Sequence, residues 1–194
     1  MLEGPGREEG TAVDLLFPRR LQAARLATSA MHRARSANRR TLDALGARIA
    51  FYFALAHERL GAGAAARGPL LDAHRAACAR HDEAGQEVLL NLLLRNYLAA
   101  GLVDAAEALR AKAPRPDPPR SPQEFARHLF YLGVIRASRL EYSDARDALL
   151  QASRKVGEAG RERVARAAHR WPPPTTLPPA AGPHRRPRLP RGRR

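Results

Sequence analysis

The chain has 194 residues, which is enough for one domain with a hydrophobic core and too few for a two-domain enzyme. Its formal net charge of +15 would ordinarily indicate nucleic acid or another anionic partner. However, residues 157–194 hold ten of the arginines against two glutamates, and all but two of the 34 basic residues are arginine, so we attribute the excess to a compositional bias.

Cysteine use and hydropathy favour an intracellular protein. Cys78 is the only cysteine, which excludes an internal disulfide and fits the reducing cytosol or nucleus. No stretch approaches the roughly 18 consecutive apolar residues of a membrane span, and the acidic, glycine-rich residues 1–10 do not resemble a signal peptide. We therefore expect a soluble protein of the cytoplasm and nucleus, with no membrane partner.

Residues 1–37 are interpreted as an N-terminal extension. Up to Pro18 they have little pattern, which predicts disorder. Residues 19–35 are basic and rich in alanine, which is compatible with a helix.

Four arginines around the boundary between this extension and the following segment form a candidate basic cluster: Arg33, Arg35, Arg39 and Arg40. Clustered arginines bind phosphate groups without regard to base sequence and also act as nuclear-import signals. No aromatic residue is interleaved to stack on bases, so we expect no specific nucleic-acid partner.

Helical periodicity is clear over residues 38–156, which we predict to be a helical-repeat domain. Apolar side chains recur at helical spacing from Leu42 to Leu60. A glycine-rich turn at positions 61, 63 and 68 then leads into a second helix over 70–80; because the turn joins two helices, it is not a phosphate-binding loop. Residues 87–98 are apolar nearly all round, which predicts a helix buried on most sides, and a shorter helix follows at 104–112.

A proline-rich segment at 114–119 separates these helices from a last pair. Ser121-Pro-Gln-Glu124 is typical of a helix start, with serine as N-cap and proline at the first position. We expect one face of this helix, and of its partner, to pack together, and Ser143 to cap the partner. The residues on these faces are Ala126, Phe130, Gly133, Ala137 and Leu140, and Ala145, Ala148, Leu149, Ala152 and Val156.

Two similar segments lie forty residues apart, Asp104-Ala-Ala-Glu-Ala-Leu109 and Asp144-Ala-Arg-Asp-Ala-Leu149, each in the second helix of a hairpin. This period is typical of stacked helix pairs, and part of the tetratricopeptide pattern is present at Leu132, Gly133, Ala145 and Leu149. The predicted fold is an all-α, tetratricopeptide-like, right-handed α-solenoid of antiparallel helix pairs. Residues 157–194 are predicted to be a disordered tail rich in proline and arginine.

Four strings within residues 38–156 resemble one protein family, that of non-ATPase regulatory subunit 3 of the proteasome regulatory-particle lid. They are Asn38-Arg-Arg-Thr-Leu-Asp43, Arg80-His-Asp-Glu-Ala-Gly-Gln86, Leu89-Leu-Asn-Leu-Leu-Leu-Arg-Asn-Tyr-Leu98 and Leu140-Glu-Tyr-Ser-Asp-Ala-Arg146.

The resemblance implies a non-catalytic scaffold that acts in ubiquitin-dependent protein degradation, with other lid subunits as partners. In that family the helical repeats are followed by a PCI module, which has no counterpart in this sequence. We therefore expect the repeat portion of such a subunit, or a truncated relative. Two alternatives stay open: a basic nucleic-acid-binding adaptor, and a non-functional truncated product.

Position and residue type make Arg95, Tyr97, Arg136 and Tyr142 candidates for contact with a partner. No residue pattern indicates a catalytic site, a cofactor or a small-molecule ligand.

One group of residues has the spacing of a metal site but too few ligands. His74, Cys78 and His81 share one side of a helix, but zinc needs a fourth ligand and none is near in sequence. We expect a buried cysteine flanked by surface histidines and no bound metal.

Overall fold

The computed structural model describes residues 9–36, 43–113 and 119–156. These residues form seven α-helices and no strand, which confirms the all-α prediction. The helices are α1 (Glu9–Ser36), α2 (Asp43–Arg59), α3 (Gly63–Ala79), α4 (Glu83–Ala99), α5 (Val103–Lys112), α6 (Pro122–Ser138) and α7 (Tyr142–Lys155). None of the described helices is both long enough and apolar enough to cross a membrane. The proline-rich segment at 114–118 and the tail at 157–194 lie outside the described residues.

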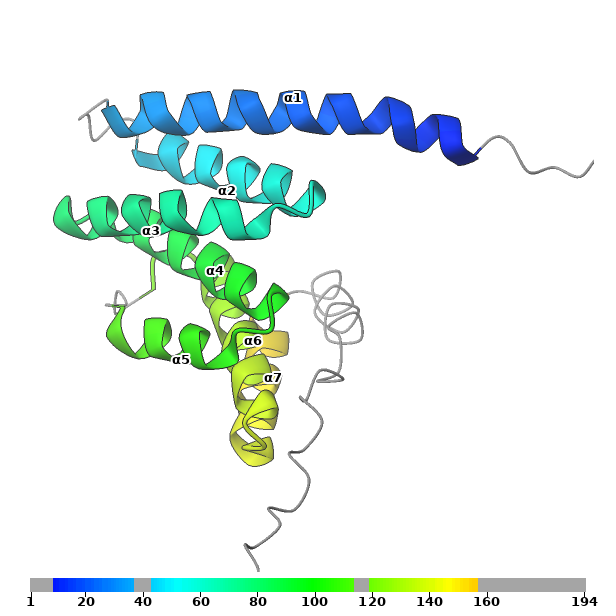
Figure 1. The fold of residues 1–194 in the computed structure, drawn as a ribbon. Coiled ribbons are helices and arrows are strands. Elements are labelled where there is room, and N and C mark those ends of the chain that lie inside the picture. The colour runs from blue at the N-terminus through cyan, green and yellow to red at the C-terminus, as the bar shows by residue number, and fades with distance from the viewer. Residues whose placement is uncertain (1–8, 37–42, 114–118, 157–194) are drawn as a thin grey trace, which may run out of the picture.

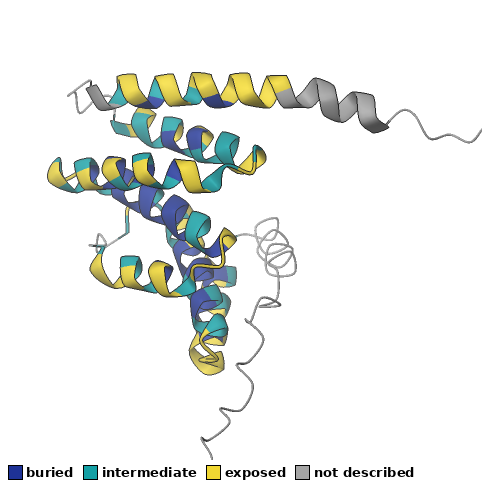
Figure 2. Ribbon diagram, in the orientation of Figure 1, coloured by how far each residue is buried: buried dark blue, intermediate teal, exposed yellow. Residues whose placement is uncertain are grey.

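The helices stack in chain order, from α1 at one end to the α6–α7 hairpin at the other (Figure 1). Helix α4 is the centre of this stack and contacts α2, α3, α5 and α6. Its apolar residues are divided between two cores. Leu93 packs with Phe53 and Leu70 in the first, whereas Leu94 packs with Ile135 in the second. The prediction of a helix buried on most sides is thus confirmed, and Figure 2 shows α4 as the most continuously buried helix.

The sequence-based account of the N-terminal extension needs a correction, because α1 begins at Glu9 and contains Pro18. Proline fixes φ near the helical value, so a helix can pass through it at the cost of one backbone hydrogen bond. Helix α1 packs along α2, and Met31 joins the first core.

Helix α3, which was expected over residues 70–80, also begins earlier, at Gly63. Only Gly61 of the three glycines has a positive φ, of +70°, whereas positions 63 and 68 lie within α3. A glycine weakens a helix by about 1 kcal/mol without forbidding it, and α3 gains more from burying Ala66 and Leu70.

The four short turns have the same construction. Each places one residue at positive φ, namely Gly61, His81, Gly101 and Leu140. The amide of that residue, and the amide after it, donate to carbonyls of the helix just ended, as in a Schellman cap.

Two expectations about the last hairpin were wrong. Leu140 lies in the turn with 70% of its surface exposed, instead of on the packed face. Ser143 is inside α7, whose N-cap is Glu141, and its hydroxyl lies 3.5 Å from Asp144 Oδ1. By contrast, Ser121 is the N-cap of α6, as predicted.

Candidate protein-interaction surface

A groove opens between the end of α2, the start of α3 and the end of α4, with a volume of about 360 Å³. Apolar side chains of α2 and α4, including Phe51, Leu55 and Leu92, form much of its wall. Polar side chains also line it: Glu58, Arg67, Arg95 and Asn96. An apolar groove with a few charged groups at its side is a usual form for a protein-binding site.

Arg95 is the candidate contact residue that lies in this groove. Its Nη2 atom is 2.8 Å from each carboxylate oxygen of Glu58, so the ion pair joins α4 to α2. Burial alone would lower the pKa of Arg95, but the hydrogen bond to Glu58 and the electrostatic interaction with Tyr131 outweigh it and raise that pKa. Arg95 therefore stays charged.

Sequence reasoning missed two polar residues beside Arg95. Arg67 Nε donates to Asn96 Oδ1 at 2.7 Å, and Asn96 Nδ2 donates to the Gly63 carbonyl at 2.8 Å. The Arg67 guanidinium also lies 5.3 Å from the ring centroid of Tyr97, a cation–π contact. The signal available in the sequence was Asn96 itself, since an amide in a nearly apolar helix must find partners.

The other two candidates lie elsewhere. Arg136 Nη1 is 2.9 Å from Asp144 Oδ2, which ties α6 to α7. Tyr142 begins α7 and is 67% exposed, close in sequence to the exposed Leu140. The α6–α7 turn lies at the end of the stack away from the groove, so the structure separates the four candidates into two pairs (Figure 1).

The basic cluster is only partly described. Arg33 lies on the exposed side of α1 and donates to Ser29 Oγ at 2.9 Å. Arg35 belongs to α1, and Arg39 and Arg40 lie outside the described residues. The role of this cluster stays a prediction.

The histidine and cysteine group differs from the expectation. His74 is the buried member, Cys78 is half-buried, and His81 lies in the turn at positive φ. The Cys78 Sγ atom is 3.8 Å from His74 Nδ1, and burial raises the pKa of the thiol. Among the described residues, no group of three His, Cys, Asp or Glu side chains could hold a metal ion.

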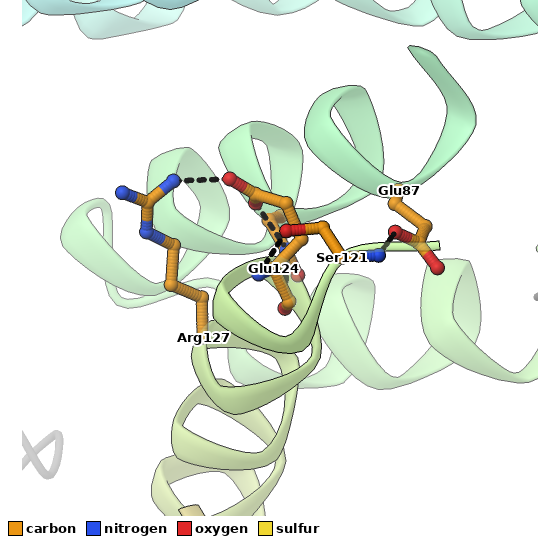
Figure 3. Close-up of polar contacts among 5 residues, drawn as sticks. Glu87, Ser121, Glu124 and Arg127 are labelled. Atoms are coloured by element: carbon orange, nitrogen blue, oxygen red, sulfur yellow. Dashed lines mark hydrogen bonds and ion pairs between the residues drawn. The ribbon is translucent and has the colours of Figure 1, made fainter. Parts of the chain in front are cut away.

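A set of polar contacts, called the polar joint below, fixes the start of α6 against α4. It joins Glu83, Glu87 and Asn91 of α4 to residues 120–124, just after the segment at 114–118. The buried carboxylate of Glu87 accepts hydrogen bonds from the backbone amides of Arg120 at 2.8 Å and Ser121 at 3.2 Å. Figure 3 shows Glu87 facing the Ser121 amide, with Glu124 and Arg127 on the adjoining turn of α6. Buried backbone amides at a helix start need acceptors, and here a side chain from another helix provides them.

The joint extends one turn along α4. Asn91 Nδ2 donates to the Glu124 carbonyl at 2.9 Å and to Glu124 Oε2 at 2.8 Å. Glu83, one turn before Glu87, pairs with the Arg120 side chain. Positions 83, 87 and 91 are spaced by four residues, so one face of α4 sets the position of the α6–α7 hairpin.

Comparison with known proteins gives a family match. The family described as "PSMD3-like, N-terminal TPR repeats" matches residues 17–167.

Curated relatives agree with this match. A probable 26S proteasome non-ATPase regulatory subunit 3 from Nicotiana tabacum is 52% identical over 138 residues, which is 71% of this chain and 28% of the relative. The Drosophila melanogaster protein of the same name is 48% identical over 118 residues, 61% of this chain and 24% of the relative. A probable 26S proteasome regulatory subunit rpn3 from Schizosaccharomyces pombe is 40% identical over 124 residues, 64% of this chain and 25% of the relative. The chain thus matches about a quarter of the length of each.

Proposed function

The chain belongs to the PSMD3-like family, in the part that carries the N-terminal TPR repeats, and from this premise we propose that it is a non-catalytic structural piece of the proteasome regulatory particle. In this role it holds neighbouring lid subunits in place and contributes indirectly to ubiquitin-dependent protein breakdown. Its relatives are named as non-ATPase regulatory subunits, which supports a role without chemistry of its own. The same premise favours the cytoplasm and nucleus as its location.

The observation that carries this proposal is the groove at Arg95, within a stack of helices that matches the family. Stacked helix pairs present extended surfaces and commonly act by binding other proteins. We propose that the groove, with Arg95 in its wall and Tyr97 beneath the adjoining Arg67, contacts one neighbour. The end of the hairpin that bears Arg136 and Tyr142 contacts another. Exposed aromatic and arginine side chains are enriched at such contacts.

Binding of the purified full chain to isolated lid subunits tests the proposal. Arg95→Ala should weaken binding at the groove, and Tyr142→Ala should weaken binding at the turn. Arg75→Ala is the matched control, because it removes an exposed arginine of α3 that pairs with Asp72, three residues earlier in the same helix. If all three variants bind as the unchanged chain does, neither surface is a contact.

Salt dependence separates this proposal from a nucleic-acid adaptor. The adaptor is favoured by the exposed Arg19, Arg20 and Arg25 of α1, since residues 18–36 contain no acidic residue. Binding through phosphates should collapse between low and physiological salt, whereas a packed protein interface should largely survive.

A further inference from the structure

Ser121 is the only serine or threonine in the 194 residues that is followed by proline. Proline-directed protein kinases select this pair, and proline holds the residue before it in an extended conformation. Ser121 has this conformation, with φ of −125° and ψ of 121°. Its neighbours Arg120, Pro122 and Gln123 are exposed, so an enzyme can reach the chain on both sides of the serine.

The hydroxyl group of Ser121 is held only weakly. It accepts a hydrogen bond from the Glu124 amide at 3.4 Å, which is long for a bond of this type. The serine is itself partly exposed. Freeing the hydroxyl for reaction therefore disturbs little more than the first turn of α6.

The surroundings of Ser121 are rich in negative charge. Glu87 is buried behind it and accepts from its backbone amide, and Glu124 lies one turn ahead (Figure 3). The two arginines of this region already have carboxylate partners, Arg120 with Glu83 and Arg127 with Glu124. A new dianion at this position would thus compete with carboxylates for the same donors.

We propose that Ser121 is a phosphorylation site for a proline-directed protein kinase, and that the phosphate loosens the contact between α4 and α6. In the reaction, Ser121 Oγ forms a bond to the γ-phosphorus of ATP as the bond from that phosphorus to the bridging oxygen breaks. ADP leaves, and the hydroxyl proton passes to the base of the kinase.

The phosphate acts through the polar joint. It carries a charge of about −1.5 to −2 at neutral pH and accepts hydrogen bonds strongly. It therefore competes with Glu87 for the amides of Arg120 and Ser121, and it draws the Arg120 side chain away from Glu83. Glu87 is then a buried carboxylate without its partners, so the α6–α7 hairpin is held less firmly on α4.

The test treats the folded full chain with a purified proline-directed kinase and ATP, and locates the phosphate by mass spectrometry. A synthetic peptide of residues 116–127 serves as the accessible reference substrate, and Pro122→Ala removes the recognition feature but keeps the serine. Hydrogen exchange of the amides over 123–128 is then compared with and without phosphate. We expect exchange to become roughly tenfold faster. Repulsion between neighbouring like charges commonly costs about one pKa unit of free energy, which is a factor of about ten in the opening equilibrium.

Glu87→Gln makes the second part of the test specific. Glutamine keeps an acceptor for only one of the two amides, and it removes the charge that opposes the phosphate. The effect of phosphorylation on exchange, measured against the unphosphorylated variant, should therefore shrink. A phosphate that acted only by unwinding the helix start would have the same effect in both proteins.

The expected result is phosphate on Ser121 of the folded chain and none on Pro122→Ala. Phosphorylation should speed up amide exchange, and this increase should be smaller in Glu87→Gln. The proposal is overturned if the peptide accepts phosphate and the folded chain does not, since the serine is then inaccessible. It is equally overturned if neither accepts phosphate, or if the phosphorylated chain exchanges at an unchanged rate.

Discussion

Gly133 of α6 lies directly against Leu149 of α7, and a Cβ atom added at Gly133 would stand 2.7 Å from Leu149 Cγ. It would also stand 3.3 Å from the Ala145 carbonyl oxygen. The two helices of the last hairpin thus approach at a position where only glycine fits without a shift. This is the contact that the partial tetratricopeptide pattern predicts.

Gly133→Ala should therefore destabilise the chain by about 1–3 kcal/mol, because an overpacked contact forces side chains and backbone apart. Gly46→Ala is the matched control. It also lies within a helix, but nothing stands within 4 Å of its added Cβ, so it should stabilise by about 0.5–1 kcal/mol. Urea unfolding followed by circular dichroism measures both. Equal stability of the two variants would contradict the close approach.

The side-chain amide of Asn91 donates the hydrogen bonds that hold the start of α6. Replacing Asn91 by aspartate, which has no N–H donor, should break this contact. Asn91→Asp replaces two hydrogen bonds to Glu124 by repulsion between two carboxylates in a buried place, with a cost of about 3 kcal/mol at neutral pH. Asn96→Asp is the comparison for the new charge: it also loses a bond, from Asn96 Nδ2 to the Gly63 carbonyl, but it places its carboxylate beside Arg67 and should cost less. The prediction is wrong if the two variants lose the same stability in urea unfolding.

Leu140 occupies the left-handed region with φ of +66°, where a branched side chain is strained. It is also largely exposed, so Leu140→Gly should raise the free energy of unfolding by about 1 kcal/mol. Gly101→Ala at the equivalent turn, with φ of +71°, should lower it by a similar amount. A lower melting temperature for Leu140→Gly would mean that the leucine makes a stabilising contact.

Burial lowers the pKa of His74 below its ordinary value of 6.5, so the folded state favours the neutral ring. The unfolded chain binds the proton more readily as the pH falls below about 6.5, and the stability linked to this ring is lost progressively down to the lowered pKa of the folded state. The free energy of unfolding between pH 8 and pH 5 should fall less steeply in His74→Gln. An identical slope in both proteins would show that the ring is not held neutral.

Much of the fold follows from local sequence signals. The Ser121 cap, the glycine at position 61 and the helical spacing of apolar residues each have a cause within a few neighbouring residues, and each prediction agrees with the structure. The start of α1 does not follow from the local sequence, because proline usually marks a helix boundary, whereas Pro18 is accommodated within the helix. The prediction for Leu140 was wrong because this residue belongs to the turn between α6 and α7. Its exposure follows from the turn and not from the helical spacing of apolar residues.

The polar contacts between helices were beyond local reasoning. Glu87 and Asn91 find their partners 33 or 34 residues further along the chain, across the segment at 114–118. Their position four residues apart in an apolar helix indicates a buried polar face. It does not indicate which backbone groups this face binds. The same limit explains why Arg95 could be chosen from the sequence while its partner Glu58 could not.

We propose that this chain is a scaffold piece that contacts subunits of the proteasome regulatory particle. Affinity purification of the tagged full chain from cell extract at physiological salt, followed by mass spectrometry of the retained proteins, tests it most directly. We predict recovery of other regulatory-particle subunits, reduced by Arg95→Ala or Tyr142→Ala and unaffected by Arg75→Ala. Recovery of only chaperones and RNA-binding proteins would contradict the claim.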